Sequence, residues 1–526
     1  MRIRLIIGAA ITFLGTSFIF APTATNAESE AFPINYDTAF SDPLLGLNTS
    51  TSNMDQTAAY EQMRLIKCAY RIPYTVENPR EDGYVDPTGY CNGPLRDIRI
   101  TRNIRVELAA DRFNDVKLGN WDPTALPNTE TTLYAGLNAL LKTREAYGRM
   151  FHTSTLSDSG LKSLKANVFN NKGSDLYVTC KNAKKGGGCF SGARSSAMHV
   201  KTLTIEYEGS TTELEGLAPE DGLYATRNQA GEPVKNAVLH TSSNLGSRSF
   251  DQTFNNAITV YNDDALMKGT DEAFVAMAAR NKASKSGTEG ASSGSYYKPS
   301  SIWPASAPGM FLGEDSAQNG GSEEGSRATR FVFLPMQNVN NMERDPFMGL
   351  LNQVAPDESC EIRVMHNRFK TRRAILANKL SELSNNGCAV ELVAFKDDKG
   401  ELGQPVHCGL GHPVRICPPV LGMLTQGDGI KVYSAAIHDK VMMIKGRFKD
   451  GNGEIETVVQ SGTASFTHLN IISSDEVATF YWDPEIYEDF REHWDTMLSR
   501  ADTCAVNINT GKLTGSTTYC NRSKYN

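Results

Sequence analysis

Two short segments of the chain each carry a histidine and, two residues later, a lysine. Residues 198–206 contain His199 and Lys201, and residues 437–445 contain His438 and Lys440. In both segments the lysine is followed by apolar and β-branched residues, a pattern that predicts a strand. Side chains two positions apart lie on one face of a strand, so each segment would aim an imidazole and an ammonium at the same point. A strand that aims both groups at one point can hold a phosphate group.

Each segment is followed downstream by a turn rich in hydroxyl groups. The turns are Thr241-Ser242-Ser243-Asn244 and Gly462-Thr463-Ala464-Ser465. This doubled arrangement resembles the phospholipase D superfamily, in which two H-x-K-x4-D motifs, each with a later G-S-x-N element, meet at one active site. The resemblance is strong near the motifs, where it includes residues 255–258 and 331–395, and it is weak before about Val168.

The resemblance implies a mechanism with a covalent intermediate. One histidine attacks phosphorus to form a phosphohistidine, and the other acts as general acid and then as base for the incoming water or alcohol. The first motif usually supplies the nucleophile, which implies attack by His199 and proton transfer by His438. Lys201 and Lys440 would hold the phosphoryl oxygens. This mechanism uses neither a metal ion nor an organic cofactor, and we expect none.

Other polar residues are expected to support these four. Hydroxyl and amide groups can donate hydrogen bonds to oxyanions without titrating near neutral pH. The expected substrate-binding residues are Ser242, Asn244, Thr463 and Ser465. Glu476 stands eleven positions after Ser465 and matches an acidic residue that the family often carries. Its expected role is either to orient a histidine or to cap a turn.

The sequence departs from the family pattern at three positions. Glu206 replaces the aspartate of the first motif and keeps its charge, so it would still support the local hydrogen bonds. Lys445 replaces the aspartate of the second motif and reverses its charge, which would disfavour an imidazolium at a nearby His438. Ser465 replaces asparagine. Reduced activity, a narrower substrate range and loss of catalysis are therefore open alternatives.

The N-terminus predicts export of the protein. Arg2 and Arg4 precede an apolar stretch that ends in small residues at Ala27, which is the pattern of a signal peptide spanning residues 1–27. We expect a secreted protein, extracellular or periplasmic after cleavage.

Ten cysteines fit an oxidising compartment, and we expect neighbours along the chain to form disulfides. Sequence does not fix the connectivity. The expected pairs are Cys68–Cys91, Cys180–Cys189, Cys360–Cys388, Cys408–Cys417 and Cys504–Cys520. A metal site at His407, Cys408, His412 and Cys417 is the alternative for one pair, but it lacks the paired C-x-x-C spacing of structural zinc.

The chain is long enough for two domain-sized cores. Residues 283–327 are rich in Gly and Ser and read as a linker or long loop between an N-terminal half, residues 28–282, and a C-terminal half, residues 328–526. In the C-terminal half we predict strands at 331–334, 360–365 and 388–395 and helices at 346–354 and 373–383. Alternating strands and helices indicate an α/β class. The resemblance implies two similar α/β/α sandwich halves packed around one shared active site, which permits the monomer that we expect.

These observations favour a secreted phosphodiesterase of phospholipase D type. It would hydrolyse phospholipid headgroups, or transfer them to alcohols, with peripheral contact to a membrane. A net charge of −7 argues against a protein that coats nucleic acid, which makes nucleic acid the less favoured partner. The alternatives are a secreted, metal-independent endonuclease of the same superfamily and a pseudoenzyme that binds phosphodiesters without cleaving them because of Lys445.

Overall fold

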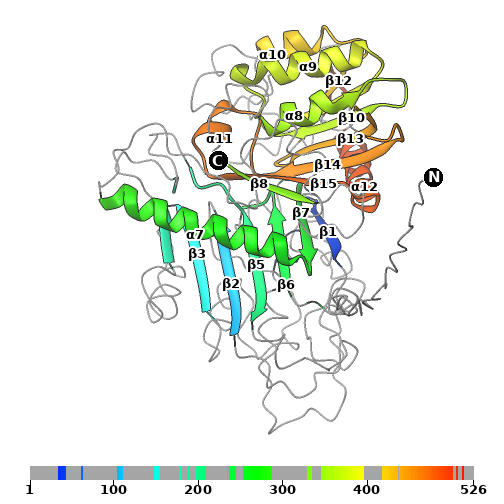
Figure 1. Cartoon of the computed structure of the whole chain (residues 1–526). Coiled ribbons are helices and arrows are strands. Elements are labelled where there is room, and N and C mark those ends of the chain that lie inside the picture. Colours follow the sequence, from blue (N-terminus) through cyan, green and yellow to red (C-terminus); the bar gives the residue numbers. More distant parts are fainter. Residues whose placement is uncertain are drawn as a thin grey trace, which may run out of the picture.

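The computed structural model shows a mixed α/β fold with two large sheets, one in each half of the chain (Figure 1). It describes residues 34–42, 58, 61–62, 65, 103–110, 147–153, 177–180, 188–189, 197–208, 234, 236–244, 253–286, 329–334, 345–395, 418–435, 437–449, 451–501, 505–507 and 512–514. The predicted α/β class is confirmed.

The first sheet has seven strands in the order β1-β7-β6-β5-β2-β3-β4. Its strands are β1 (Asn35–Ser41), β2 (Asn103–Ala110), β3 (Tyr147–Thr153), β4 (Tyr177–Cys180), β5 (Thr202–Glu208), β6 (Asn236–Thr241) and β7 (Asn255–Tyr261). Helix α7 (Asp264–Ser286) follows β7. The first H-x-K motif ends where β5 begins, as its apolar pattern predicts.

The second sheet has eight strands, of which seven follow the order β12-β11-β10-β13-β14-β15-β8 and β9 pairs with β13. Its strands are β8 (Arg330–Leu334), β9 (Val354–Ala355), β10 (Glu361–His366), β11 (Ala389–Phe395), β12 (Lys431–Ala435), β13 (Lys440–Phe448), β14 (Glu456–Gly462) and β15 (Glu476–Tyr481). Its helices are α8 (Pro346–Gln353), η9 (Thr371–Arg373), α9 (Ala374–Asn385), α10 (Pro418–Leu424), α11 (His468–Ile472) and α12 (Pro484–Ala501). Strands β16 (Ala505–Asn507) and β17 (Lys512–Thr514) form a separate pair.

The two sheets repeat one topology. Read from β1 and from β8, the strand orders match position by position, and matching neighbours are parallel or antiparallel in the same way. Helices α7 and α12 also match, because each begins after an aspartate whose carboxylate caps it. Asp263 Oδ1 accepts from Leu266 N at 2.8 Å, and Asp483 Oδ1 accepts from Ile486 N at 3.0 Å. The duplication read from the motifs therefore extends through both halves.

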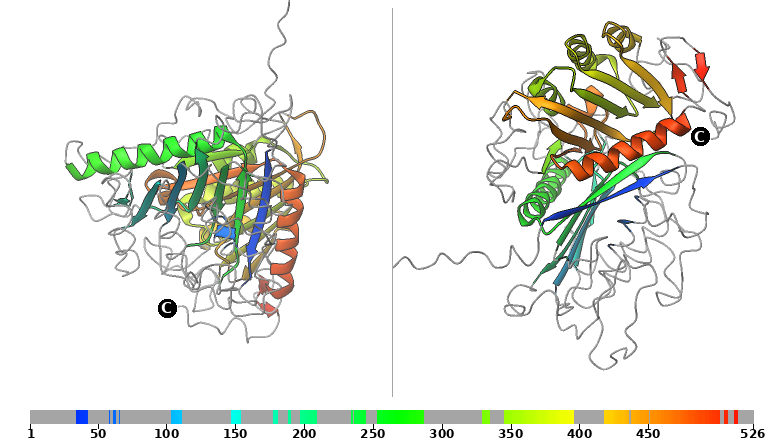
Figure 2. Two further views of the ribbon diagram at one scale, coloured as in Figure 1. Left: turned by 90° about the horizontal axis from the view of Figure 1, so that it is seen from below. Right: turned by 90° about the vertical axis from the view of Figure 1, so that its right-hand side faces the viewer.

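The two halves exchange contacts through these helices (Figure 2). Helix α7 packs on β4, β5 and β6 of its own sheet and on β8 of the other, and α12 packs on β12 and β14 of its own sheet and on β1 of the other. One apolar core includes residues of both sheets and both helices, among them Phe254, Phe274, Phe333, Met443 and Trp494. Its burial of large side chains holds the halves in one arrangement.

The C-terminal half has a second core on the other face of its sheet. There α8, α9 and α10 cover the strands, with Leu351, Leu376 and Leu424 among the fully buried side chains. The predicted strands at 331–334, 360–365 and 388–395 and the helices at 346–354 and 373–383 are confirmed within two residues at each end. Helix α9 ends at Asn385, and Gly387 after it has a φ of +112°, which suits glycine and allows Cys388 N to donate to Leu383 O at 3.1 Å.

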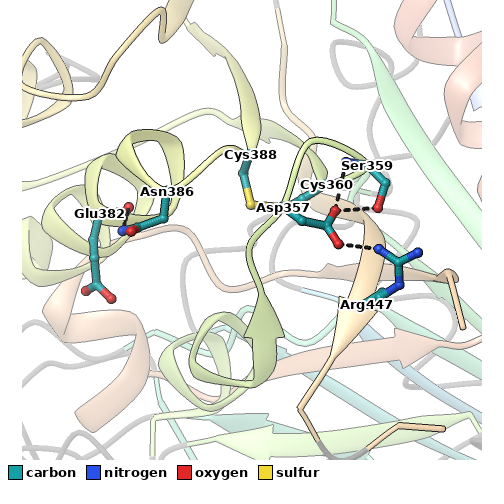
Figure 3. Close-up of a disulfide and its surroundings, with 7 residues drawn as sticks. All are labelled: Asp357, Ser359, Cys360, Glu382, Asn386, Cys388 and Arg447. Carbon is teal, nitrogen blue, oxygen red and sulfur yellow. Dashed lines mark hydrogen bonds and ion pairs between the residues drawn. A yellow bond between two sulfur atoms is a disulfide. The ribbon is translucent and has the colours of Figure 1, made fainter. Parts of the chain in front are cut away.

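Two of the five expected disulfides are confirmed, Cys180–Cys189 and Cys360–Cys388. The second joins the starts of the parallel strands β10 and β11, next to Asp357 (Figure 3). The carboxylate of Asp357 accepts from Ser359 N at 2.8 Å and pairs with Arg447 on β13. The other six cysteines, with His407 and His412, lie outside the described residues.

The predicted N-terminal signal peptide also lies outside the described residues, so export stays a prediction. Helix α7 continues to Ser286, inside the predicted linker, and the remainder of that segment, 287–327, is not described. Among the described residues, none of the helices combines the length and the apolar character needed to span a bilayer.

Candidate active site

The two H-x-K motifs meet at the junction of the halves through a reciprocal backbone contact. His199 N donates to Asp475 O at 2.7 Å, and His438 N donates to Phe254 O at 2.9 Å. Asp475 and Phe254 hold matching places, directly before β15 and β7. Each motif therefore rests on the opposite half, and the internal twofold relationship brings both to one junction.

Both motif lysines are buried at this junction. Lys201 is 4% exposed and Lys440 is 3% exposed, and the Nζ of each donates to the carbonyl of the histidine two residues earlier, at 2.8 Å in the first motif. Burial lowers the pKa of Lys440 well below its usual range, and the nearby Lys201 ammonium lowers it further. An anion bound between the two would relieve their repulsion, so the pair suits a phosphoryl group.

His199 is oriented by a carboxylate of the other half. Its Nδ1 lies 2.8 Å from Oε1 of Glu476, whose side chain is fully buried and which also accepts from the amide of Asn470. A carboxylate acceptor places a ring proton on Nδ1, which makes Nε2 the nitrogen that carries the lone pair in the neutral ring. Of the two roles expected for Glu476, this geometry matches orientation of a histidine.

His438 is oriented by two acceptors of the first half. Its Nδ1 lies 2.9 Å from Ser242 O and 3.1 Å from Asn255 Oδ1. The Asn255 amide points its oxygen at the ring because its Nδ2 donates to Thr253 O at 3.0 Å and to Thr253 Oγ1 at 2.8 Å. Lys440 Nζ lies 3.3 Å from the same Nδ1 but donates to His438 O. Two oxygen acceptors favour a proton on Nδ1, so Nε2 of His438 is the nitrogen that can take up and release a second proton.

Asn255 is a site residue that the motif analysis missed. It follows Ser242 by thirteen positions, as Glu476 follows Thr463. The same spacing in both halves was the available signal. The two histidines thus have matching partners of different chemistry, a carboxylate for His199 and a neutral amide for His438.

The hydroxyl turns lock onto the strands that follow them. Ser242 Oγ accepts from Asn256 N and Thr463 Oγ1 accepts from Val477 N, both at 3.0 Å, and both hydroxyl residues are fully buried. These contacts position the turns, and direct hydrogen bonds from the two hydroxyls to a substrate stay a prediction. Such a role would require each hydroxyl to leave its present partners.

The other two turn residues, Asn244 and Ser465, differ in their contacts. Ser465 Oγ donates to Asn367 Oδ1 at 2.6 Å, next to the end of β10. Oδ1 of Asn244 is buried and meets no hydrogen-bond partner among the described residues. Substrate binding by these two residues stays a prediction.

Glu206 and Lys445 lie away from the catalytic groups. Each follows its motif lysine by five positions along β5 or β13, a distance of about 16 Å, and an odd separation puts it on the opposite face of the strand. Lys445 instead stands in register with Glu361 on β10 and Thr457 on β14. The expectation that its charge acts on a nearby His438 is not met, because the strand carries Lys445 away from the ring.

Two additional histidines, His240 and His366, are buried beside the site. Burial lowers the pKa of His240 to about 3, and the charges of Lys201 and Lys440 add to the effect. Burial also lowers the pKa of His366, whose ring stacks on Phe466 with centroids 3.5 Å apart. Both rings are therefore neutral near pH 7.

A disulfide anchors the segment that carries His199. Cys189 N donates to the carboxylate of Asp475, the residue whose carbonyl accepts from His199 N. The Cys180 and Cys189 sulfurs lie with that carboxylate within 4.8 Å, but a disulfide offers no thiolate to a metal ion.

The fold is similar to that of several solved structures at low sequence identity. Polyphosphate kinase from Porphyromonas gingivalis is 10% identical with a TM-score of 0.42, over 93% of this chain and 55% of the kinase, so this chain spans just over half its length. Phosphatidylserine synthase from Haemophilus influenzae Rd KW20 is 10% identical with a TM-score of 0.39, over 78% and 83% of the two chains. Nuc from Salmonella typhimurium, a phospholipase D family member, is 18% identical with a TM-score of 0.23, over 33% and 94%. The sequence matches no protein-family model and no curated protein.

Proposed function

We propose that this chain is a phosphodiesterase of phospholipase D type that works through a phosphohistidine. One observation carries the proposal: each motif histidine has its Nδ1 held by the opposite half, next to a pair of buried lysines. Two imidazoles, each oriented through its Nδ1, and two cations are what nucleophilic attack, proton transfer and stabilisation of a phosphoryl group require. The doubled motif supports the same conclusion.

In the first step Nε2 of His199 attacks phosphorus, the bond to the leaving oxygen breaks, and His438, which enters the step protonated on both ring nitrogens, gives its Nε2 proton to that oxygen. In the second step His438 takes a proton from water or an alcohol, which attacks phosphorus and releases His199. Lys201 and Lys440 neutralise the charge on the nonbridging oxygens in both steps.

The different partners of the two histidines support this division of roles. A phosphohistidine carries positive charge, which the Glu476 carboxylate stabilises. The neutral amide of Asn255 leaves His438 more ready to release its proton to a leaving alkoxide. Exchange of the two roles would place the carboxylate on the acid, where it would hold the proton back.

For the substrate we propose phospholipid headgroups, and for the location the outside of the cell or the periplasm. The signal-peptide pattern and the cysteine content support export, and the net charge of −7 favours a lipid over a nucleic acid. Transfer of the phosphatidyl group to an alcohol follows from the same intermediate, since an alcohol can replace water in the second step.

The test is release of choline from phosphatidylcholine vesicles in EDTA by the mature protein, by His199→Asn and by His438→Asn. His468→Asn is the matched control, because His468 starts α11 outside the junction. The proposal is supported if His199→Asn and His438→Asn each abolish choline release while His468→Asn retains it. Cleavage of single-stranded DNA but not of lipid would support the endonuclease, and binding of vesicles without cleavage of either substrate would support a pseudoenzyme. Full activity of His199→Asn would overturn the mechanism.

A further inference from the structure

The residue between His438 and Lys440 joins the two halves through a buried polar network. Asp439 is fully buried, and its Oδ1 accepts from Asn256 Nδ2 at 2.6 Å and from Ser242 Oγ at 3.3 Å. Its Oδ2 lies 3.0 Å from Nε2 of His493 on α12. One carboxylate therefore links β7 and the hydroxyl turn of the first half to a helix of the second.

The internal duplication supplies a comparison for this network. Val200 holds the place of Asp439 between the motif histidine and lysine, and Val477 holds the place of Asn256, since both donate a backbone N–H to the hydroxyl of the preceding turn. Ala273 holds the place of His493, because each lies ten residues after the aspartate that caps its helix.

All three counterparts are apolar, and they lie buried in one core. The fold thus builds the same junction twice, once with apolar side chains and once with polar ones. A buried carboxylate is costly to desolvate and stays favourable only when it is fully paired. Because the apolar version is sufficient for the fold, the polar version calls for another explanation.

The network surrounds the groups that orient His438. Ser242, whose hydroxyl lies 3.1 Å from Asn255 Oδ1 and 3.3 Å from Asp439 Oδ1, supplies one acceptor of the His438 ring through its carbonyl. Asn255, the neighbour of Asn256, supplies the other. Oδ1 of Asn256 accepts from Ser461 Oγ at 2.9 Å, which fixes that amide from the second half as well. Asp439 therefore contacts Ser242, which supplies one acceptor of the ring, and Asn256, the residue next to the other acceptor.

His493 supports the same region from the other side. Its ring stacks on Phe40 of β1 with centroids 4.3 Å apart and meets the edge of Phe254 at 5.8 Å. Phe254 is the residue whose carbonyl accepts from His438 N. The ring of His493 thus packs on the residue that holds the His438 backbone, while its Nε2 holds Asp439.

We propose that Asp439 and His493 are positioning residues for proton transfer by His438, an inference that rests on the proposed function. They do not touch the reacting atoms. They fix the acceptors of the His438 ring, and so the direction in which its Nε2 faces the leaving oxygen. The carboxylate that orients His199 lies on the other side of the internal twofold, so nucleophilic attack does not depend on this network.

If the network serves only proton transfer by His438, its loss should affect substrates with poor leaving groups most, and this can be tested with two esters. Methyl p-nitrophenyl phosphate releases an acidic phenol that needs little protonation, whereas methyl phenyl phosphate releases a weaker acid that depends on His438. The variants are Asp439→Val and His493→Ala, each of which introduces the residue found at the matching place in the first half. Val459→Ala is the control, since Val459 lies in the same apolar core and its side chain has no polar atom to join the network. Urea unfolding of every variant measures the structural effect separately.

We expect both network variants to lower kcat for the phenyl ester about tenfold more than kcat for the nitrophenyl ester. The control should lower stability but leave the ratio of kcat for the phenyl ester to kcat for the nitrophenyl ester unchanged. Asp439→Asn keeps an acceptor for Asn256 and Ser242. Its ratio of the two kcat values should therefore lie between those of Asp439→Val and the wild type. Equal losses on the two esters, or wild-type rates in the folded variants, would overturn the inference.

Three further outcomes complete the test. If Asp439→Val does not fold, the triple variant Asp439→Val, His493→Ala, Asn256→Val reproduces the apolar cluster of the other half and enters the same comparison. Wild-type protein that cleaves neither ester nor lipid would refute the proposed function itself. Cleavage by the wild type with uniform losses in the variants would refute the positioning role alone.

Discussion

His199 and Glu476 are separated by 277 positions in the chain, yet Nδ1 of the imidazole lies 2.8 Å from Oε1 of the carboxylate. Asp475, the residue before Glu476, accepts from His199 N through its carbonyl. In the C-terminal half, a backbone carbonyl and a neighbouring carboxylate thus hold the backbone and the ring of His199 in the N-terminal half. A site built in this way forms only when both halves are folded and docked, so its activity reports on the junction.

We expect the charge of Glu476 to matter more for catalysis than the size of its side chain. Glu476→Gln keeps the shape and an acceptor oxygen but removes the charge that stabilises a phosphohistidine, so kcat should fall about 10²-fold or more with KM little changed. Steady-state rates on methyl p-nitrophenyl phosphate measure this. Glu206→Gln, on the far side of β5, is the control and should stay near wild type. A rise in KM with an unchanged kcat would instead indicate that Glu476 acts in substrate binding.

Asn255→Asp would give His438 the kind of partner that His199 has. A carboxylate stabilises the imidazolium, so the limb of the kcat/KM profile that reports the acid should move to higher pH. At neutral pH the variant should be slower on esters with poor leaving groups, because the acid holds its proton more tightly. The measurement is kcat/KM between pH 5 and pH 9 for both esters. Profiles that coincide with the wild type would rule out His438 as the titrating acid.

The sequence was sufficient for the repeated architecture but not for the partners of the catalytic groups. The apolar runs that follow Lys201 and Lys440 predicted strands β5 and β13. Asn255 and Asp439 were missed because their contacts cross from one half to the other, and a single sequence carries no register between halves. The expected influence of Lys445 failed for a local reason. The motif was read as one cluster, whereas strand geometry separates its last position from its first.

Restoring the motif aspartate at Lys445 should not raise activity. Lys445 stands in register with Glu361, an opposite-charge cross-strand pair worth about 0.2–1 kcal/mol, and aspartate there would face a like charge. We expect Lys445→Asp to change kcat/KM less than about twofold and to lower the free energy of unfolding by about 1 kcal/mol. Lys445→Met, which removes the charge without reversing it, is the control. A large gain in activity for aspartate would mean that the position acts on the site.

Loss of the Cys180–Cys189 disulfide should impair catalysis as well as stability. Cys189 N holds the Asp475 carboxylate, and Asp475 O holds His199 N, so a loosened loop would blur the position of the nucleophile. Replacing both cysteines by serine should cost about 2 kcal/mol of stability and reduce kcat of the folded protein. The matched control is Cys360→Ser with Cys388→Ser, at the far ends of β10 and β11, which should cost stability alone. Equal kcat in the two double variants would exclude the effect on His199.

Acid should destabilise the fold through His240. Its pKa is about 3 in the folded state because the ring is buried near Lys201 and Lys440, whereas an unfolded histidine has a pKa of about 6.5. Between these values the unfolded chain binds more protons, so stability is fully present above pH 6.5 and is lost as pH falls through the window. From pH 8 to pH 5 the loss from this one residue is about 2 kcal/mol, and His366 acts in the same direction.

In His240→Leu this dependence of stability on pH should be reduced, since leucine fills the place beside Phe331 without a proton to bind. Urea unfolding at both pH values measures the difference, and parallel losses in wild type and variant would show that His240 is not a source of the acid sensitivity.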